Sequence, residues 1–341
     1  MGNPFVERPT SISTLAALLK KRFRAGGSLD DMIEAILISQ KTLESMPEDS
    51  PFRTDLWTTL GDLFAAKFGR TWATSDLEEA VHNYRCAVEH PTGNTLRRII
   101  AATSVMPLCL SLQDAYDIGR TAIDLVPGIA AARSLETSDR QHLLSYSRGL
   151  AASVTCAAIR LKRDPSEALA ILEQGRGILG SSLDDLRTDT KELHEEFGED
   201  PGSRRRNAAK SFDGLLNEIP KMPGFEDFLG RLTTDQIRAA ATYGPIVIIN
   251  SSWMGCEGIV IERERITSMI FKDLDDGELM ERAEGFDLGT PDMLEWLWDT
   301  ITGRVLEALG FTETPPNQQE WPHVWWMPTG PLSRFPLHAS G

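Results

Sequence analysis

The stretch DLEEAVHNYRCAVEHP, from Asp76 to Pro91, decides the fold of the first part of the chain. Its apolar residues recur at intervals of three and four, which is the periodicity of a helix with one buried face. Ser75 precedes the pattern as an expected N-cap, and the helix is expected to end before Pro91. A second helix of the same kind is expected over Leu56 to Phe68.

The same pattern returns elsewhere in the sequence. An acid followed by alanine and an apolar residue begins at Glu34, Glu79, Asp114 and Glu167, and the alanines are 45, 35 and 53 residues apart. A small residue at this point lets two antiparallel helices approach closely. We therefore expect each unit to be a helix pair that buries its apolar face by stacking on neighbouring pairs. The four alanines are Ala35, Ala80, Ala115 and Ala168.

The pattern changes after about residue 240. Three short β-branched runs separated by turns predict a meander of adjacent antiparallel strands. An acidic stretch of ten acids and one base then covers residues 273–299, and we interpret it as a solvated surface, or else as a site that recruits a basic partner. An amphipathic helix is expected from Met293 to Leu309. The expected strands are 245–249, 258–261, 266–271 and 324–327.

The composition argues against two classes of ligand, nucleic acid and anionic membrane. The 341 residues hold 50 acids and 35 bases, a net charge of −15, so nucleic acid and anionic membrane are excluded as main ligands because phosphate would be repelled. The basic cluster Arg204–Arg206 adjoins acidic residues and is expected to be solvated. Residues 1–24 lack the apolar core of a signal peptide, and no run is apolar enough to span a membrane. We expect a soluble, cytoplasmic protein.

Two short motifs resemble a cofactor-binding and a metal-binding sequence, but neither meets the requirements of such a site. Gly175–Gly180 matches G-x-G-x-x-G, but a dinucleotide site needs these glycines between a strand and a helix. Here the motif falls in or at the end of a helix, so glycine-mediated helix packing is expected and no cofactor is assigned. His194-Glu195-Glu196 lacks a second histidine four residues on, and no other histidine has ligand spacing, so no metal is assigned.

Cys256 with His323 or His338 is the one formal cysteine–histidine pair. A catalytic thiol needs a lowered pKa, whereas Glu257 beside Cys256 is expected to raise the pKa of the thiol. A buried structural cysteine is therefore expected. The four cysteines lie far apart with no C-x-x-C pair, so neither a zinc finger nor a disulfide framework is expected.

Residues 56–91 resemble a tetratricopeptide repeat (TPR). Leu60-Gly61, Phe64, Ala80, Tyr84, Ala87 and Pro91 fall in that family's order, with seven extra residues between Gly61 and Ala80. The other copies are more degenerate. The resemblance implies an α-solenoid of helix pairs.

The C-terminal stretch WWMPTGPLSRFPLHA, residues 325–339, resembles the "PTGPL…LPLHAAG" segment of CHAT domains. These caspase-like domains are found behind TPR arrays in many fungal proteins. Residues 244–250 with 256–260 resemble the opening hairpin of the family, and residues 172–188 resemble the helix that precedes it. Residues 76–88 resemble its TPR units.

These resemblances imply a mostly α, TPR-like solenoid over residues 1–235, followed by a partial α/β caspase-like domain over 240–341. The family's histidine and cysteine belong to later motifs, "H-x-x-C-H-G" and "S-A-C", and neither occurs here. No catalytic residue is therefore assigned, and the chain, expected to end within the CHAT domain, is expected to be inactive. Missing strands would leave an open sheet edge at the Pro245 and Trp325 strands, so residues 240–341 alone should be poorly soluble.

Three hypotheses for function follow. The first is a TPR-mediated protein-interaction or regulatory array fused to an incomplete cysteine-protease-like domain. The second is a non-catalytic scaffold that binds a protein or peptide on the array, with a vestigial CHAT end. The third, and weakest, is a self-contained hydrolase that uses Cys256 with His338.

Overall fold

The computed structural model describes residues 9–126, 137–185, 218, 221–222, 233–274, 276–285, 288–313 and 323–340. The chain divides into two compact units. The first comprises Met1–Leu150 and Gly175–Ala209, and the second comprises Ala151–Gln174 and Lys210–Gly341. The second unit thus includes residues 151–174, which the sequence analysis placed with the helical repeats. None of the described helices has the length and apolarity that a membrane span requires.

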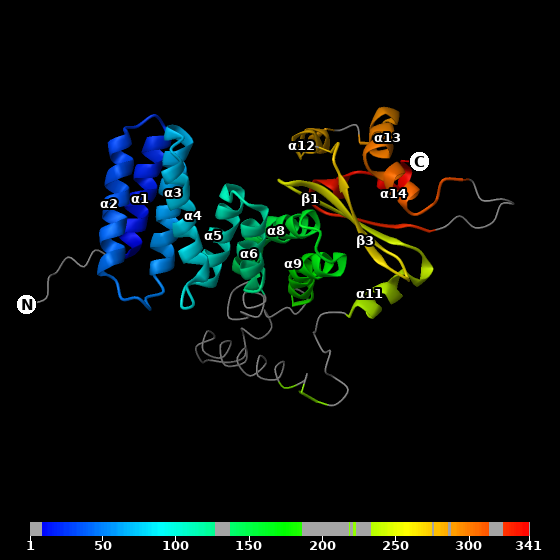
Figure 1. Cartoon of the computed structure of the whole chain (residues 1–341), viewed down its shortest axis with the longest axis horizontal. Coiled ribbons are helices and arrows are strands. Elements are labelled where there is room, and N and C mark those ends of the chain that lie inside the picture. The colour runs from blue at the N-terminus through cyan, green and yellow to red at the C-terminus, as the bar shows by residue number, and fades with distance from the viewer. Residues whose placement is uncertain are drawn as a thin grey trace, which may run out of the picture. The chain divides into compact units, whose positions relative to one another are not determined.

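The first unit is helical throughout its described residues (Figure 1). Each helix packs against the next one along the chain, and α1 contacts α3, α3 contacts α5 and α4 contacts α6. Ser28, Asn94 and Ser111 cap the N-termini of α2, α5 and α6 with side-chain oxygens. The helices are α1 (Pro9–Arg24), α2 (Leu29–Ser45), α3 (Arg53–Thr71), α4 (Thr74–Glu89), α5 (Thr95–Val105) and α6 (Leu112–Ile123).

The repeat alanines occupy equivalent places in successive helix pairs. Ala35 lies on α2, Ala80 on α4 and Ala115 on α6, each the second helix of a pair, and all three are buried. Ala168 is buried on α9 (Pro165–Asp185), which follows α8 (Thr137–Arg160), and its carbonyl accepts a hydrogen bond from Thr155 on α8. The burial of all four alanines is compatible with the expected close approach of paired helices at these positions.

Helices α3 and α4 approach each other closely at Gly61 on α3. A Cβ added there would lie 2.7 Å from ring carbons of Tyr84 on α4. The Tyr84 hydroxyl donates to Asp62 at 2.6 Å, and Lys20 on α1 forms an ion pair with the same carboxylate at 2.5 Å. Glycine is thus required by the space available, and α1, α3 and α4 are joined at one point.

The second unit holds a four-stranded mixed sheet in the order β3-β2-β1-β4. β1 pairs antiparallel with β2 and parallel with β4, and β2 pairs antiparallel with β3. The expected meander is confirmed. The strands are β1 (Ile246–Ser252), β2 (Gly255–Ile261), β3 (Ile266–Phe271) and β4 (Trp325–Pro328).

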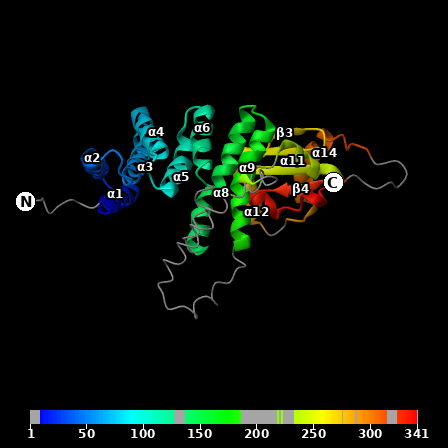
Figure 2. The ribbon, with the colours of Figure 1, turned by 90° about the horizontal axis from the view of Figure 1, so that it is seen from below.

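Helices cover both faces of this sheet (Figures 1 and 2). Val247 and Ile249 of β1, with Cys256 of β2, point into an apolar core with α12 (Asp276–Glu284), α13 (Pro291–Leu297) and α14 (Gly303–Ala308). Alternate residues of a strand point to opposite faces, so Asn250 and Glu257 face the other layer, formed by α8 and α9. α11 (Thr234–Ala240) precedes β1. The described protein is therefore mostly helical with one small mixed sheet, in agreement with the coarse expectation.

Three local expectations needed correction. α4 begins at Thr74 with Ala73 at the N-cap position, so Ser75 lies inside the helix and is not its cap. β1 continues to Ser252, three residues beyond the expected end, because the polar residues there find hydrogen-bond partners. The helix expected over residues 293–309 contains a π-helical turn, Trp298–Thr302, between α13 and α14.

Candidate functional site

The most unusual side chain of the second unit is Glu257, a carboxyl group buried in the middle of β2. It has no solvent exposure and pairs across the sheet with Asn250. Its neighbour Cys256 points into the apolar core, so Glu257 points to the opposite face, where α8 lies. A buried carboxyl group requires partners, because removing a charge from water costs several kcal/mol, roughly, unless it is compensated.

Two residues of α8 supply these partners. Arg160 donates from Nε to Oε1 of Glu257 at 2.9 Å, and Cys156 donates from Sγ to the same oxygen at 2.9 Å. The two donors are four residues apart and therefore lie on one side of the helix. The other oxygen, Oε2, is buried and accepts no hydrogen bond from the described residues.

The burial and the hydrogen bonds of this cluster shift the pKa values of Glu257 and Cys156. Burial raises the pKa of the Glu257 carboxyl, while the hydrogen bonds from Cys156 and Arg160 lower it. Burial also raises the pKa of the Cys156 thiol, and the charge of Glu257 raises it further. A thiol that stays protonated is a poor nucleophile. The arrangement thus attaches α8 to the sheet and disfavours covalent catalysis at Cys156.

Polar residues at the end of β1 also bond to other segments, Asn250 to α8 and Ser251 to Thr329, the residue after β4. The Asn250 amide donates to the Ala152 carbonyl of α8 at 2.9 Å, and the Ser251 N–H donates to the Thr329 hydroxyl at 3.2 Å. Gly255 has φ +130°, and a Cβ there would lie 2.3 Å from Nη2 of Arg160. Glycine is favoured at this turn because L side chains rarely adopt a φ of +130°, whereas the flexible Arg160 guanidinium could move away from an added Cβ.

Cys256 lies within the apolar core and is fully buried, as the sequence analysis predicted for a structural cysteine. His338 is exposed on a 3-10 turn, and exposed His323 contacts the Trp325 ring at 5.9 Å between centroids. All four cysteines, Cys86, Cys109, Cys156 and Cys256, are free thiols in the structure. The expected effect of Glu257 on the pKa of the Cys256 thiol stays a prediction, and Glu257 raises the pKa of the Cys156 thiol on the opposite face of the sheet.

The glycine-rich motif lies inside α9, as expected. α9 runs without a break from Pro165 to Asp185, and the preceding element is the helix α8, so the strand–turn–helix context of a dinucleotide site is not met. His194 and Arg204–Arg206 lie outside the described residues. Over the described parts of the chain, no three His, Cys, Asp or Glu side chains gather in a way that would hold a metal ion.

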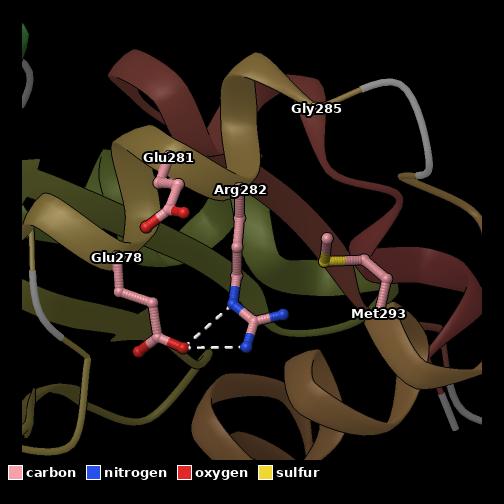
Figure 3. Close-up of a pocket in the computed structure, with 5 residues that line it drawn as sticks. All are labelled: Glu278, Glu281, Arg282, Gly285 and Met293. Carbon is pink, nitrogen blue, oxygen red and sulfur yellow. Dashed lines mark hydrogen bonds and ion pairs between the residues drawn. The ribbon is translucent and has the colours of Figure 1, made fainter.

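A pocket of about 390 Å³ lies in the acidic stretch, between α12 and α13 (Figure 3). Arg282 is the base at its centre. It forms an ion pair with Glu278 at 2.8 Å and lies 4.5 Å over the Trp296 ring. The contact with Trp296 joins α12 to α13, whereas the pair with Glu278 lies within α12, so both contacts have a structural role. Recruitment of a basic partner by residues 273–299 stays a prediction. The lining residues are Glu278, Glu281, Arg282, Gly285 and Met293.

The contacts that bring Cys156, Arg160 and Glu257 together were not predicted from the sequence. Its members are separated by 97 and 101 residues, and no short motif joins them. The available signal was strand alternation, which places Glu257 on the face opposite Cys256. That signal does not say which helix covers the face.

No family model matches the chain, and neither a curated protein nor a solved structure matches it. The TPR and CHAT resemblances are therefore predictions.

Proposed function

We propose that this chain is a non-catalytic protein-binding module of the cytoplasm. Its first unit would be a TPR-like array of helix pairs, and its second a partial, CHAT-like α/β sandwich in which no described residue acts as a nucleophile. The burial of the repeat alanines on the second helices of successive pairs supports the array. The protonated state of Cys156 and the location of Cys256 in the core support the absence of catalysis.

One observation carries the assignment of a binding surface. Leu29, Ile33 and Leu37 form an exposed stripe along α2, with 39%, 42% and 51% of each residue exposed. They are spaced by four residues and therefore lie on one side of the helix. An exposed apolar stripe of this kind suits contact with another apolar surface better than contact with water.

The equivalent positions in the next two pairs are also exposed but polar. Counting from the repeat alanines, Ile33 and Leu37 correspond to Glu78 and His82 on α4, and to Gln113 and Asp117 on α6. Exposure at these positions is thus common to the three pairs, whereas apolar side chains are specific to the first. The stripe is therefore unlike the surfaces that join one helix pair to the next.

The charges beside the stripe indicate the partner. Exposed Asp30 and Glu34 each follow a stripe residue, exposed Glu44 lies further along the helix, and Lys41 is the one base of α2. An amphipathic helix with basic residues beside its apolar face would complement both the apolar and the charged parts. We assign such a helix as the partner.

The test is titration of the full chain with a model amphipathic helix of Leu and Lys, and with the same peptide carrying Glu in place of Lys. The Lys peptide should bind, and Ile33→Asp should weaken binding about tenfold or more. Leu110→Asp is the matched control, because it adds the same charge at an exposed leucine elsewhere in the first unit. Equal binding by wild type and Ile33→Asp, or equal binding of both peptides, would contradict the proposal.

A further inference from the structure

Among the described residues, β4 forms one edge of the sheet of the second unit. β4 is the last strand in the order β3-β2-β1-β4, and no described residue pairs with its outer side. An edge strand presents unpaired N–H and C=O groups and so accepts another strand readily.

The hydrogen bonds to β1 define which groups face outward. The N–H groups of Trp325 and Thr329 donate to carbonyls of Pro245 and Ile249. Alternate residues of a strand direct their backbone groups to opposite sides, so the groups of Val324, Trp326 and Pro328 point away from β1. Pro328 has no N–H and offers only its carbonyl oxygen.

The side chains of this edge are apolar and exposed. Trp325 is 52% exposed and Met327 is 43% exposed, and both lie on the same face because they pair with Ile246 and Ile248 of β1. Trp326 points to the other face and packs partly on the core. Trp325 and Met327 are therefore placed symmetrically on either side of Trp326.

We propose that β4 pairs antiparallel with β4 of a second copy of this chain, with Trp326 opposite Trp326 of that copy. In this register the two Trp326 residues exchange both backbone hydrogen bonds. Each Trp325 then lies opposite Met327 of the second copy, in a pair without backbone hydrogen bonds, where side chains are closest. An indole against a thioether is a favourable contact. The N–H of Val324 also meets the carbonyl of Pro328, whose missing N–H limits extension of the pairing.

The edge at β4 is free of the charges that would keep two copies of this chain apart. Two chains of net charge −15 repel each other over most of their surfaces, but residues 324–333 contain no charged side chain. A two-fold axis through Trp326 makes the edge complementary to itself. Because the strand is short, the interface is small and the dimer should dissociate on dilution.

Sedimentation or light scattering of the full chain over a concentration series tests the pairing. The mass should rise toward twice 37.8 kDa, and Trp325→Lys and Met327→Lys should each abolish the rise. Trp253→Lys is the matched control, since Trp253 is 49% exposed in the β1–β2 turn, and this variant should still dimerise. A monomer at every concentration, or a dimer that is insensitive to both β4 variants, would overturn the proposal.

Disulfide trapping tests the register. Residues of a non-hydrogen-bonded pair have Cα atoms about 4.5 Å apart, within the range that a disulfide spans. A mixture of Trp325→Cys and Met327→Cys chains should therefore form crosslinked dimers faster than either variant alone, with wild type giving the background of the native cysteines. Fastest crosslinking by either variant alone would overturn the register.

Discussion

The thiol of Cys156 on α8 donates a hydrogen bond to Oε1 of Glu257 on β2 at 2.9 Å. The same oxygen accepts the Nε proton of Arg160. One helix is thereby attached to the centre of the sheet, and the thiol is kept protonated. This relationship argues for a structural role of the fully buried Glu257 carboxyl group, and the first two predictions follow from it.

Removing the Glu257 carboxyl should destabilise the second unit. Glu257→Ala leaves the buried Cys156 without its acceptor and Arg160, whose side chain is 34% exposed, without its ion-pair partner, so the loss should be about 1–3 kcal/mol. Chemical denaturation followed by circular dichroism measures the loss. Glu262→Ala is the control, because it breaks the exposed pair with Arg265 and should cost no more than about 1 kcal/mol. Equal losses for the two variants would contradict the structural role.

Glu257 should also make stability depend on pH. Its pKa is raised in the folded state, so between the unfolded and folded pKa values the folded chain binds more protons than the unfolded chain. Stability from this group is therefore present below the unfolded pKa and is lost as pH rises through the folded pKa. Glu257→Gln removes this titration. The wild type should gain stability relative to Glu257→Gln as pH is lowered from 7 toward the unfolded pKa, and a relative loss would contradict the sign.

The cysteines should react slowly with alkylating agents in the native protein. Burial raises the pKa of Cys109 to about 11, and it raises the pKa of Cys156 as well. At pH 8, a thiol with a pKa of about 11, such as Cys109, has a thiolate fraction about two hundredfold smaller than that of a free cysteine. Mass spectrometry after timed iodoacetamide treatment measures the rates, with urea-unfolded protein as the control. If Cys256 reacts faster than a free model thiol, that result would support the hydrolase hypothesis.

Gly61 and Gly69 on α3 provide a matched test of helix pairing. Gly61→Ala should destabilise the first unit by about 1–3 kcal/mol, because its Cβ would overlap the Tyr84 ring. Nothing lies within 4 Å of a Cβ at Gly69, so Gly69→Ala should stabilise α3 by about 0.5–1 kcal/mol through helix propensity. The unfolding temperatures of both variants, compared with that of the wild type, measure these effects. A stabilising Gly61→Ala would contradict the close approach to α4.

Periodicity was sufficient to predict the elements whose stability is local. Helical spacing and the repeat alanines predicted the helix pairs, and β-branched runs predicted the strands. Ser75 is not the cap because helix α4 begins one residue before it, and sequence preference alone does not fix the residue at which a helix begins. The polar residues Asn250–Ser252 predicted an end of the strand at Ile249, but Asn250 is buried because its amide donates to the Ala152 carbonyl, a contact with a distant segment. Contacts between distant segments, such as Arg160 with Glu257, have no local signal in the chain.

Hydrogen–deuterium exchange of the full chain, with and without the Leu–Lys amphipathic peptide, tests the central proposal most directly. The peptide should slow exchange along α2, residues 29–45, because it covers the stripe of Leu29, Ile33 and Leu37. Exchange in β1–β4 should not change. Protection of the sheet or of other helices with α2 unaffected would contradict the proposal that the first helix pair carries the binding surface.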